Sequence, residues 1–333
     1  MENLLEINNL KTSFYTGVGE VQAVRGITFD LRKGEALGIV GESGSGKSVT
    51  MMSLMGLLPD NSKIVEGDIN FDGTIISNLR EKDMQKIRGN DIGMIFQEPM
   101  TSLNPLYSIG NQLMEPLMKH KNMKKEEAFK TAVNILNLVG IPSSEKRMKQ
   151  YPHEFSGGMR QRVMIAMAIC CNPKLLIADE PTTALDVTIQ AQILELMKDL
   201  KNKINMSIIL ITHDLGIVAD LCQRINVMYG GVLVEKGTVE DIFYSSRHPY
   251  TKGLLRSIPN PNKIVKERLK PIEGQPPDLF NPPKGCPFAP RCSKTMRICL
   301  SSPPPLFNIE GEHFSACYLN HMEAPKISWE EDL

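Results

Sequence analysis

The chain has 333 residues, and its 38 basic and 38 acidic residues give a formal net charge of zero. No basic excess therefore favours nucleic-acid binding, and no block of like charge forms a tail. Hydrophobic residues make up 41% of the chain, enough for the cores of about two folded domains.

The N-terminal residues argue against secretion. They read M-E-N-L-L-E-I-N-N-L, with acidic residues where a secretion signal needs basic ones. The longest apolar run, residues 163–171, is shorter than the ~18 residues of a membrane span and is expected to form a buried helix. We therefore expect a cytoplasmic protein.

Three segments among the first 76 residues are expected to form β structure. Residues 4–7 and 23–31 have strand-like patterns, and S-F-Y-T-G-V-G-E between them predicts a turn. An aromatic residue in this turn could stack on a purine base, with ordinary strand-end packing as the alternative. Residues 65–76 alternate around F-D-G-T and predict a hairpin.

Residues 41–48 read G-E-S-G-S-G-K-S, which matches the phosphate-binding loop G-x-x-x-x-G-K-[ST]. An apolar strand precedes the loop, and a Met- and Leu-rich helix follows it until Pro59. The glycines let backbone N–H groups wrap a polyphosphate at the helix N-terminus. Lys47 would reach the β- and γ-phosphates, and Ser48 would bind Mg²⁺. A chance glycine-rich turn is disfavoured by this strand and helix.

Polar residues then follow further strands and open a helix. Residues 92–96 predict a strand that delivers Gln97, which could bind a metal or position a water, or lie in a solvated loop. Residues 109–150 read as polar helices, whose lysines predict a solvated face. Ser156, Gly157 and Gly158 open a helix, so they form either a second anion site or an ordinary cap.

Three more side chains come at strand ends. Asp179 and Glu180 follow a buried strand, where they suit a metal ligand and a base; a helix cap and a surface acid are the alternative. Asp186 is expected to cap the next helix. His213 ends another strand, and its place beside other strand ends favours a ligand site over a structural role.

The proline-rich segment from residue 247 contains four cysteines: Cys286, Cys292, Cys299 and Cys317. Their spacing is C-x5-C-x6-C-x17-C in a segment too poor in apolar residues to form its own core. Disulfides are disfavoured in a reducing compartment, and unliganded core cysteines are a second minor alternative. Zinc sites usually contain tight C-x₂₋₄-C pairs, whereas a cysteine followed by proline suits an iron–sulfur cluster. The other cysteines, in apolar helical stretches, are expected to pack in the core.

Together these motifs resemble the ATPase subunits of ABC transporters over residues 4–245. Residues 41–48 resemble the Walker A loop, Gln97 the Q-loop glutamine, and residues 155–159 the L-S-G-G-Q signature. Residues 175–179 resemble Walker B, with Glu180 as the catalytic carboxylate, residues 184–186 resemble the D-loop, and His213 resembles the switch histidine. Phe155 and Met159 replace the Leu and Gln of the general signature.

Finer features resemble the oligopeptide/dipeptide importer ATPases: Q-E-P-M-T-S-L-N-P, H-P-Y-T-K-G-L-L and the G-C-P-F-x-P-R-C frame. The resemblance implies an α/β fold, a P-loop NTPase nucleotide-binding domain of ABC type. It would have a RecA-like core, an antiparallel β subdomain and a helical subdomain over about residues 98–165. This ATPase domain would span residues 1–246, with a small loop-rich extension over residues 247–333 that carries the cysteine site.

The resemblance also implies roles for named residues. Catalytic roles fall to Glu180, His213 and Gln97, and Mg²⁺ would be bound by Ser48, Gln97 and Asp179. Because the extension of this family carries the cysteine frame, Cys286, Cys292, Cys299 and Cys317 are expected to bind a [4Fe–4S] cluster, with zinc as runner-up. ATP would be bound by Tyr15 (Phe14 is the alternative), Gly41, Ser43, Gly44, Ser45, Gly46, Lys47, Ser48, Val49, Ser156, Gly157, Gly158 and Asp186.

The implied function is ATP-driven import of di- or oligopeptides from the cytoplasmic face of the membrane. The partners would be a second ATPase subunit in a head-to-tail nucleotide sandwich, two permease subunits and, indirectly, a peptide-binding protein, but no nucleic acid. Residues 96–105 would dock on the permease through Met100 or Leu103. The alternatives are a soluble ABC ATPase of translation or DNA repair, a non-hydrolysing regulatory subunit, and an importer of nickel or another small solute.

Overall fold

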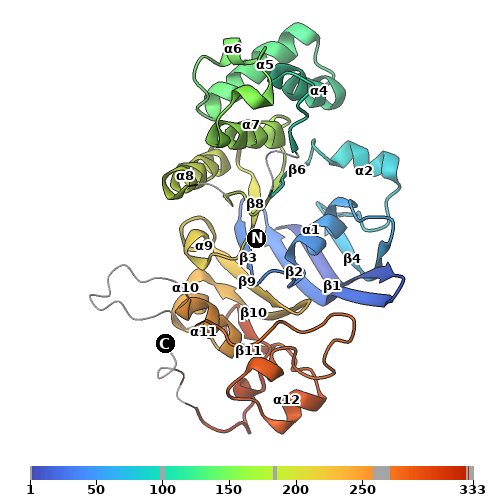
Figure 1. Ribbon diagram of the computed structural model, residues 1–333, viewed down its shortest axis with the longest axis vertical. Coiled ribbons are helices and arrows are strands. Elements are labelled where there is room, and N and C mark those ends of the chain that lie inside the picture. The colour runs from blue at the N-terminus through green and yellow to red at the C-terminus, as the bar shows by residue number, and fades with distance from the viewer. Residues whose placement is uncertain (1, 98–101, 183–185, 258–270, 328, 330–333) are drawn as a thin grey trace, which may run out of the picture. The chain divides into compact units, whose positions relative to one another are not determined.

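A computed structural model of the protein describes residues 2–97, 102–182, 186–257, 271–327 and 329 (Figure 1). The chain divides into two compact units. The helical unit comprises Met1–Glu2, Arg32–Glu35 and Asn78–Ile211, and the P-loop unit comprises Asn3–Leu31, Ala36–Ser77 and Thr212–Leu333. Among the described residues, no helix combines the length and the apolar character needed to cross a membrane.

The P-loop unit contains an antiparallel sheet in the order β2-β1-β4-β5. Its strands are β1 (Asn3–Thr16), β2 (Gly19–Arg32), β4 (Ser62–Phe71) and β5 (Thr74–Ile75). The hairpin predicted near residues 65–76 is confirmed, and the turn predicted at residues 13–20 is present but covers only residues 17 and 18. β4 begins early enough for Ser62 to pair with Phe14, so the ladder of backbone hydrogen bonds keeps residues 13–16 extended.

A second sheet of this unit has the strand order β11-β12-β10-β9-β3. Here β3 (Ala36–Val40) pairs parallel with β9 (Arg224–Tyr229), and β10 (Val232–Thr238) pairs antiparallel with β9. All five residues of β3 are buried, as its apolar sequence predicts. Helices α1 (Lys47–Met55), α9 (Leu215–Leu221), α10 (Val239–Tyr244) and α11 (Pro249–Arg256) complete this part.

The cysteine-rich extension contributes strands to the same sheet. Its hairpin of β11 (Phe307–Glu310) and β12 (His313–Ser315) adds to β10, with Ser315 opposite Glu235. Our expectation of a merely loop-rich segment missed this pairing, because its two strands are short and lie among prolines. The extension also holds α12 (Arg297–Ser301) and the 3₁₀ turns η2 (Ala289–Arg291) and η3 (Tyr318–Asn320).

The helical unit is built on parallel strands. They are β6 (Ile92–Ile95), β7 (Leu175–Asp179) and β8 (Ser207–Thr212). β7 lies between the other two and pairs parallel with both. The polar region predicted to be helical contains α4, α5 and α6, and its lysines are exposed, as expected of a solvated face. The helices are α2 (Glu81–Ile87), α4 (Ile109–Lys121), α5 (Lys125–Leu138), α6 (Ser144–Arg147), α7 (Gly157–Ile169) and α8 (Val187–Ile204), with η1 at Pro152–Glu154.

Candidate nucleotide site

The glycine loop between β3 and α1 has a backbone that larger residues would not allow. Gly41 and Gly46 have φ values of 154° and 99°. A Cβ at Gly41 would lie 2.2 Å from the Met228 carbonyl oxygen, and a Cβ at Gly46 would lie 2.6 Å from that of Ala23. No side chain caps α1, whose N-cap is Gly46, so the first-turn N–H groups at Lys47, Ser48 and Val49 are placed for an anion.

Lys47 is 6% exposed and lies folded over its own loop. Its Nζ donates hydrogen bonds to the carbonyl oxygens of Gly41 at 2.8 Å and Glu42 at 2.9 Å, and to the Ser45 Oγ at 3.3 Å. These are neutral acceptors, so a polyphosphate entering the loop would offer the ammonium group stronger, charged ones. The loop therefore keeps its lysine next to the place that the motif assigns to the β- and γ-phosphates.

The helical unit brings together two of the predicted catalytic residues. Asp179 ends β7 and is 5% exposed, and Glu180 follows it directly. The Gln97 Nε2 donates a 2.9 Å hydrogen bond to the Glu180 Oε2. Glu180 has φ = 47°, the left-handed region that non-glycine residues rarely adopt, and its N–H donates to the Ile211 carbonyl at 2.9 Å. Such backbone strain is concentrated at functional sites.

The S-G-G element is a capped helix start. The Ser156 Oγ accepts a hydrogen bond from the Met159 N–H at 3.4 Å, which is the cap alternative of the sequence analysis. A Cβ at Gly157 would meet nothing within 4 Å, so the helix start is open at that residue. Phe155 is 3% exposed with the Arg147 guanidinium 5.5 Å from its ring, so the aromatic replacement of leucine remains a core residue. An anion role for Ser156, Gly157 and Gly158 stays a prediction.

The remaining predicted residues divide between the units. In the helical unit, Asp186 caps α8 as expected, since its Oδ1 accepts from the Ile189 N–H at 3.0 Å. In the P-loop unit, His213 is exposed directly after β8. Tyr15 is 41% exposed near the end of β1, with the Lys63 Nζ 5.0 Å from its ring centroid. Their nucleotide contacts stay predictions, and residues 184 and 185 of the D-loop lie outside the described residues.

The structure does not support Leu103 as a docking residue. Leu103 is 2% exposed, so it packs inside the helical unit and cannot serve as a surface contact. Met100 lies outside the described residues. Next to this segment, Leu106 is 80% exposed and Tyr107 is 55% exposed. Large apolar side chains this exposed suit a contact surface better than Leu103 does.

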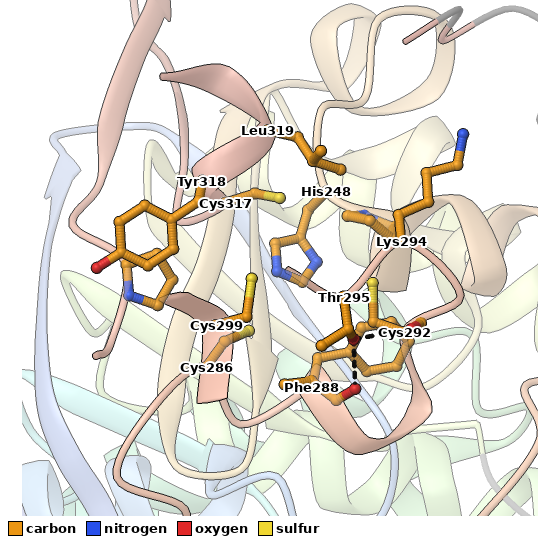
Figure 2. Close-up of a pocket in the computed structure, with 13 residues that line it drawn as sticks. His248, Cys286, Phe288, Cys292, Lys294, Thr295, Cys299, Cys317, Tyr318 and Leu319 are labelled. Atoms are coloured by element: carbon orange, nitrogen blue, oxygen red, sulfur yellow. Dashed lines mark hydrogen bonds between the residues drawn. The ribbon is translucent and has the colours of Figure 1, made fainter. Parts of the chain in front are cut away.

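The four cysteines of the extension line one small cavity of about 20 Å³ (Figure 2). Figure 2 shows the His248 ring among them. Burial raises the pKa of Cys286 to about 11 and that of Cys317 to about 12, so these thiols stay protonated without a cation. All four are free of disulfides. Among the residues that the structure describes, no three His, Cys, Asp or Glu side chains are grouped to hold a metal ion.

The other three cysteines are packing residues, as predicted. Cys170, Cys171 and Cys222 are 4%, 1% and 6% exposed. The Sγ atoms of Cys170 and Cys171 lie 3.9 Å apart in a buried environment. A Cβ at Gly38 in β3 would lie 3.5 Å from the Cys222 Sγ, so this thiol packs against the strand that precedes the glycine loop.

Sequence reasoning missed several residues that support the glycine loop. The Tyr250 hydroxyl accepts the Glu42 N–H at 2.8 Å, and Arg291 forms an ion pair with the Glu42 carboxylate. All three residues lie in motifs that the sequence analysis quotes: Glu42 is the second residue of the loop motif, Tyr250 belongs to H-P-Y, and Arg291 belongs to C-P-F-x-P-R-C. Nothing in one sequence indicates that residues this far apart meet.

The fold and the glycine loop define an ATP-binding cassette. A family model described as "ABC transporter" matches residues 24–183, and one described as "Oligopeptide/dipeptide transporter, C-terminal region" matches residues 234–299. Among solved structures, the dimeric ATP-binding cassette MJ0796 bound to ADP and phosphate is 28% identical with a TM-score of 0.64, covering 71% of this chain and 98% of its own. CbiO1 of Clostridium perfringens, part of an ABC transporter complex, is 29% identical with a TM-score of 0.62, covering 74% and 92%.

Curated relatives show which kind of ATP-binding cassette this chain resembles. The oligopeptide transport ATP-binding protein OppD of Bacillus subtilis is 58% identical over 97% of this chain and 91% of its own length. The dipeptide transport ATP-binding protein DppD of the same organism is 55% identical over 97% of both chains. This chain belongs to the family of ATP-binding subunits of oligopeptide and dipeptide ABC transporters. The expected α/β fold class and the ATPase activity are thereby confirmed.

Proposed function

We propose that this chain hydrolyses ATP to drive the import of di- and oligopeptides through membrane permease subunits. The observation that carries the proposal is the glycine loop with Lys47 folded over it, in a chain whose relatives are named for peptide transport. The chain would act at the cytoplasmic face of the membrane. There it would pair with a second ATPase subunit, either a paralogue or a second copy, and respond indirectly to a peptide-binding protein.

In the proposed reaction the chain's own residues position charge around the nucleotide. Lys47 and the N–H groups of the glycine loop bind the phosphates, and Tyr15 stacks on the adenine. Ser48, Gln97 and Asp179 would hold Mg²⁺, which would neutralise phosphate charge. Glu180 orients and deprotonates the attacking water, and His213 contacts the γ-phosphate. The hydrogen bond from Gln97 to Glu180 supports a shared task for these two residues.

The partner subunit would complete the site in a head-to-tail dimer. Its own copies of Ser156, Gly157, Gly158 and Asp186 would face the nucleotide that this chain binds. The open helix start at Gly157 supports such a contact, because its N–H groups can receive an anion from outside the chain. Closure of the dimer on ATP would then be passed to the permease subunits.

Transport by the assembled protein tests the peptide assignment. The chain is purified with its permease subunits, reconstituted in vesicles with the binding protein, and supplied with a radiolabelled tetrapeptide or with ⁶³Ni²⁺. We expect ATP-dependent uptake of the peptide and none of nickel. Nickel uptake alone would support the solute alternative, and stable association with ribosomes or DNA instead of permease would support the soluble class.

We also propose that Cys286, Cys292, Cys299 and Cys317 bind a [4Fe–4S] cluster with a structural or redox-sensing role. The chemistry of the donor set supports the proposal, because the four thiols line one cavity and no described carboxylate lines it with them. The four thiols are not grouped closely enough in this structure to hold a metal ion, so cluster binding would have to bring them together. The Gly285 position also supports the proposal, since a Cβ there would lie 2.1 Å from the Cys299 carbonyl oxygen. Only glycine allows the backbones that carry Cys286 and Cys299 to approach this closely. Zinc remains the runner-up.

Metal analysis separates the cluster from zinc. After anaerobic purification we expect a brown protein with about four irons and four acid-labile sulfides per chain, because each cysteine binds one iron. Cys317→Ser should lose most of this content. Cys222→Ser, a buried cysteine in the same unit, is the matched control and should retain it. A colourless protein with one zinc and no sulfide would reject the cluster and keep the four ligands.

A further inference from the structure

Arg291, between two of the clustered cysteines in sequence, reaches the glycine loop. Its Nη1 and Nη2 donate hydrogen bonds to the Glu42 Oε2 and Oε1 at 2.6 and 3.1 Å, a two-pronged ion pair. Glu42 directly follows Gly41 at the start of the loop. The two side chains are 5% and 27% exposed, so solvent screens this pair much less than a surface pair.

The guanidinium group of Arg291 has a partner for every N–H it carries. Besides Glu42, the Nε donates to the Glu273 carbonyl at 2.8 Å, Nη1 to the Tyr229 hydroxyl at 3.1 Å and Nη2 to the Ile272 carbonyl at 3.0 Å. These contacts hold the guanidinium group in one orientation. The hydrogen bond to Glu42 raises the pKa of Arg291 above its already high value, so the cation is permanent.

Aromatic rings connect the cysteine cavity to the same loop residue. Phe288 lines the cavity and packs against Tyr229 and Tyr250, with ring centroids 5.3 and 5.4 Å apart. The Tyr250 hydroxyl accepts the Glu42 N–H at 2.8 Å. Tyr250 is held in turn by His248, because the His248 Nδ1 accepts the Tyr250 N–H at 3.1 Å. The extension therefore binds Glu42 twice: Arg291 binds its carboxylate, and Tyr250 binds its backbone N–H.

Glu42 is a costly residue at this position unless it is neutralised. Its carboxylate belongs to a loop that receives a polyphosphate, and like charges repel strongly where solvent is partly excluded. Its carbonyl oxygen is also one of the acceptors that hold Lys47. A shift of Glu42 would therefore disturb both the charge of the loop and the lysine that binds the phosphates.

We infer that Arg291 is a positioning residue for ATP binding: from the C-terminal extension, it neutralises Glu42 and holds the glycine loop in its binding shape. The inference rests on ATP binding by the loop and does not depend on which group the cysteines bind. A purely structural anchor would change the stability of the chain and leave its ATP affinity as it is.

The test compares two ion pairs of the P-loop unit in the full chain. Isothermal calorimetry with Mg-ATP is applied to the parent, Arg291→Met, Glu42→Gln and the double variant. We expect Arg291→Met to raise Kd about tenfold, and Glu42→Gln in the same chain to recover most of the loss by removing the unpaired carboxylate. In steady-state hydrolysis, KM should rise while kcat stays within about twofold, since Arg291 is not among the residues that act on the attacking water.

Arg224→Met is the matched control, because Arg224 and Asp30 form a partly buried ion pair of 2.9 Å away from the loop. It should destabilise the chain and leave the Kd for Mg-ATP within about twofold. If Arg291→Met fails to fold, Arg291→Lys takes its place and should raise Kd about threefold. Unchanged affinity in the Arg291 variant, or an equal loss in Arg224→Met, overturns the inference. Failure of the parent to bind ATP would instead refute the proposed nucleotide site itself.

Discussion

Replacing Glu180 by glutamine will lower the rate of ATP hydrolysis by roughly 10²–10⁴-fold and leave ATP binding intact, as removal of a general base does. Glutamine keeps the shape of the side chain, and its Oε1 can still accept the hydrogen bond that Gln97 donates. The variant therefore loses the basic group with little change in geometry. With hydrolysis blocked, ATP-bound chains should accumulate as a closed dimer, measurable by size-exclusion chromatography with ATP.

Glu195→Gln makes the same chemical change at an exposed position on α8 and serves as the control for the Glu180 variant. It should hydrolyse ATP at the parent's rate. Near-normal hydrolysis by Glu180→Gln would show that another group activates the water. A matching loss of ATP binding would show that Glu180 supports the nucleotide site instead of the chemical step.

Replacing Lys47 by alanine will abolish measurable ATP binding. The loop would lose the one ammonium group that it holds over its own carbonyl oxygens, together with the charge that meets the β- and γ-phosphates. Calorimetry with Mg-ATP measures the loss, and circular dichroism checks that the chain is folded. Lys198→Ala, at an exposed position on α8, should bind ATP as the parent does. Affinity of Lys47→Ala within a few-fold of the parent's would contradict the assignment.

The parts of the site that sequence located are those whose signals are local. The glycine loop, the strand before it and the helix after it occupy one continuous stretch, so periodicity and glycine spacing were enough. The capping role of Asp186 is likewise a contact between residues three apart. The turn predicted at residues 13–20 is limited to residues 17 and 18, because its length depends on how far a distant strand, β4, extends back.

The parts that sequence missed depend on contacts between distant residues. Arg291 and Glu42 are separated by 249 positions. In the sequence each looks like an ordinary surface charge, and only the three-dimensional structure shows that they form an ion pair. The left-handed backbone of Glu180 is equally invisible, because glutamate gives no hint of positive φ. Burial of Leu103 also depended on the tertiary fold, since the residue lies in a polar stretch that reads as a loop.

The pairing of β12 with β10 sets an order of events while the protein is being made. Glu235 in β10 is 0% exposed and forms a 2.8 Å hydrogen-bonded pair with the His313 Nε2. Until the ribosome has released residues 313–315, β10 has an open edge and Glu235 lacks this partner. An open strand edge invites pairing with other chains. This sheet can therefore finish folding only after residues 313–315 have left the ribosome. A chain that stops at residue 246 would keep the unpaired edge of β10, which could pair with other chains.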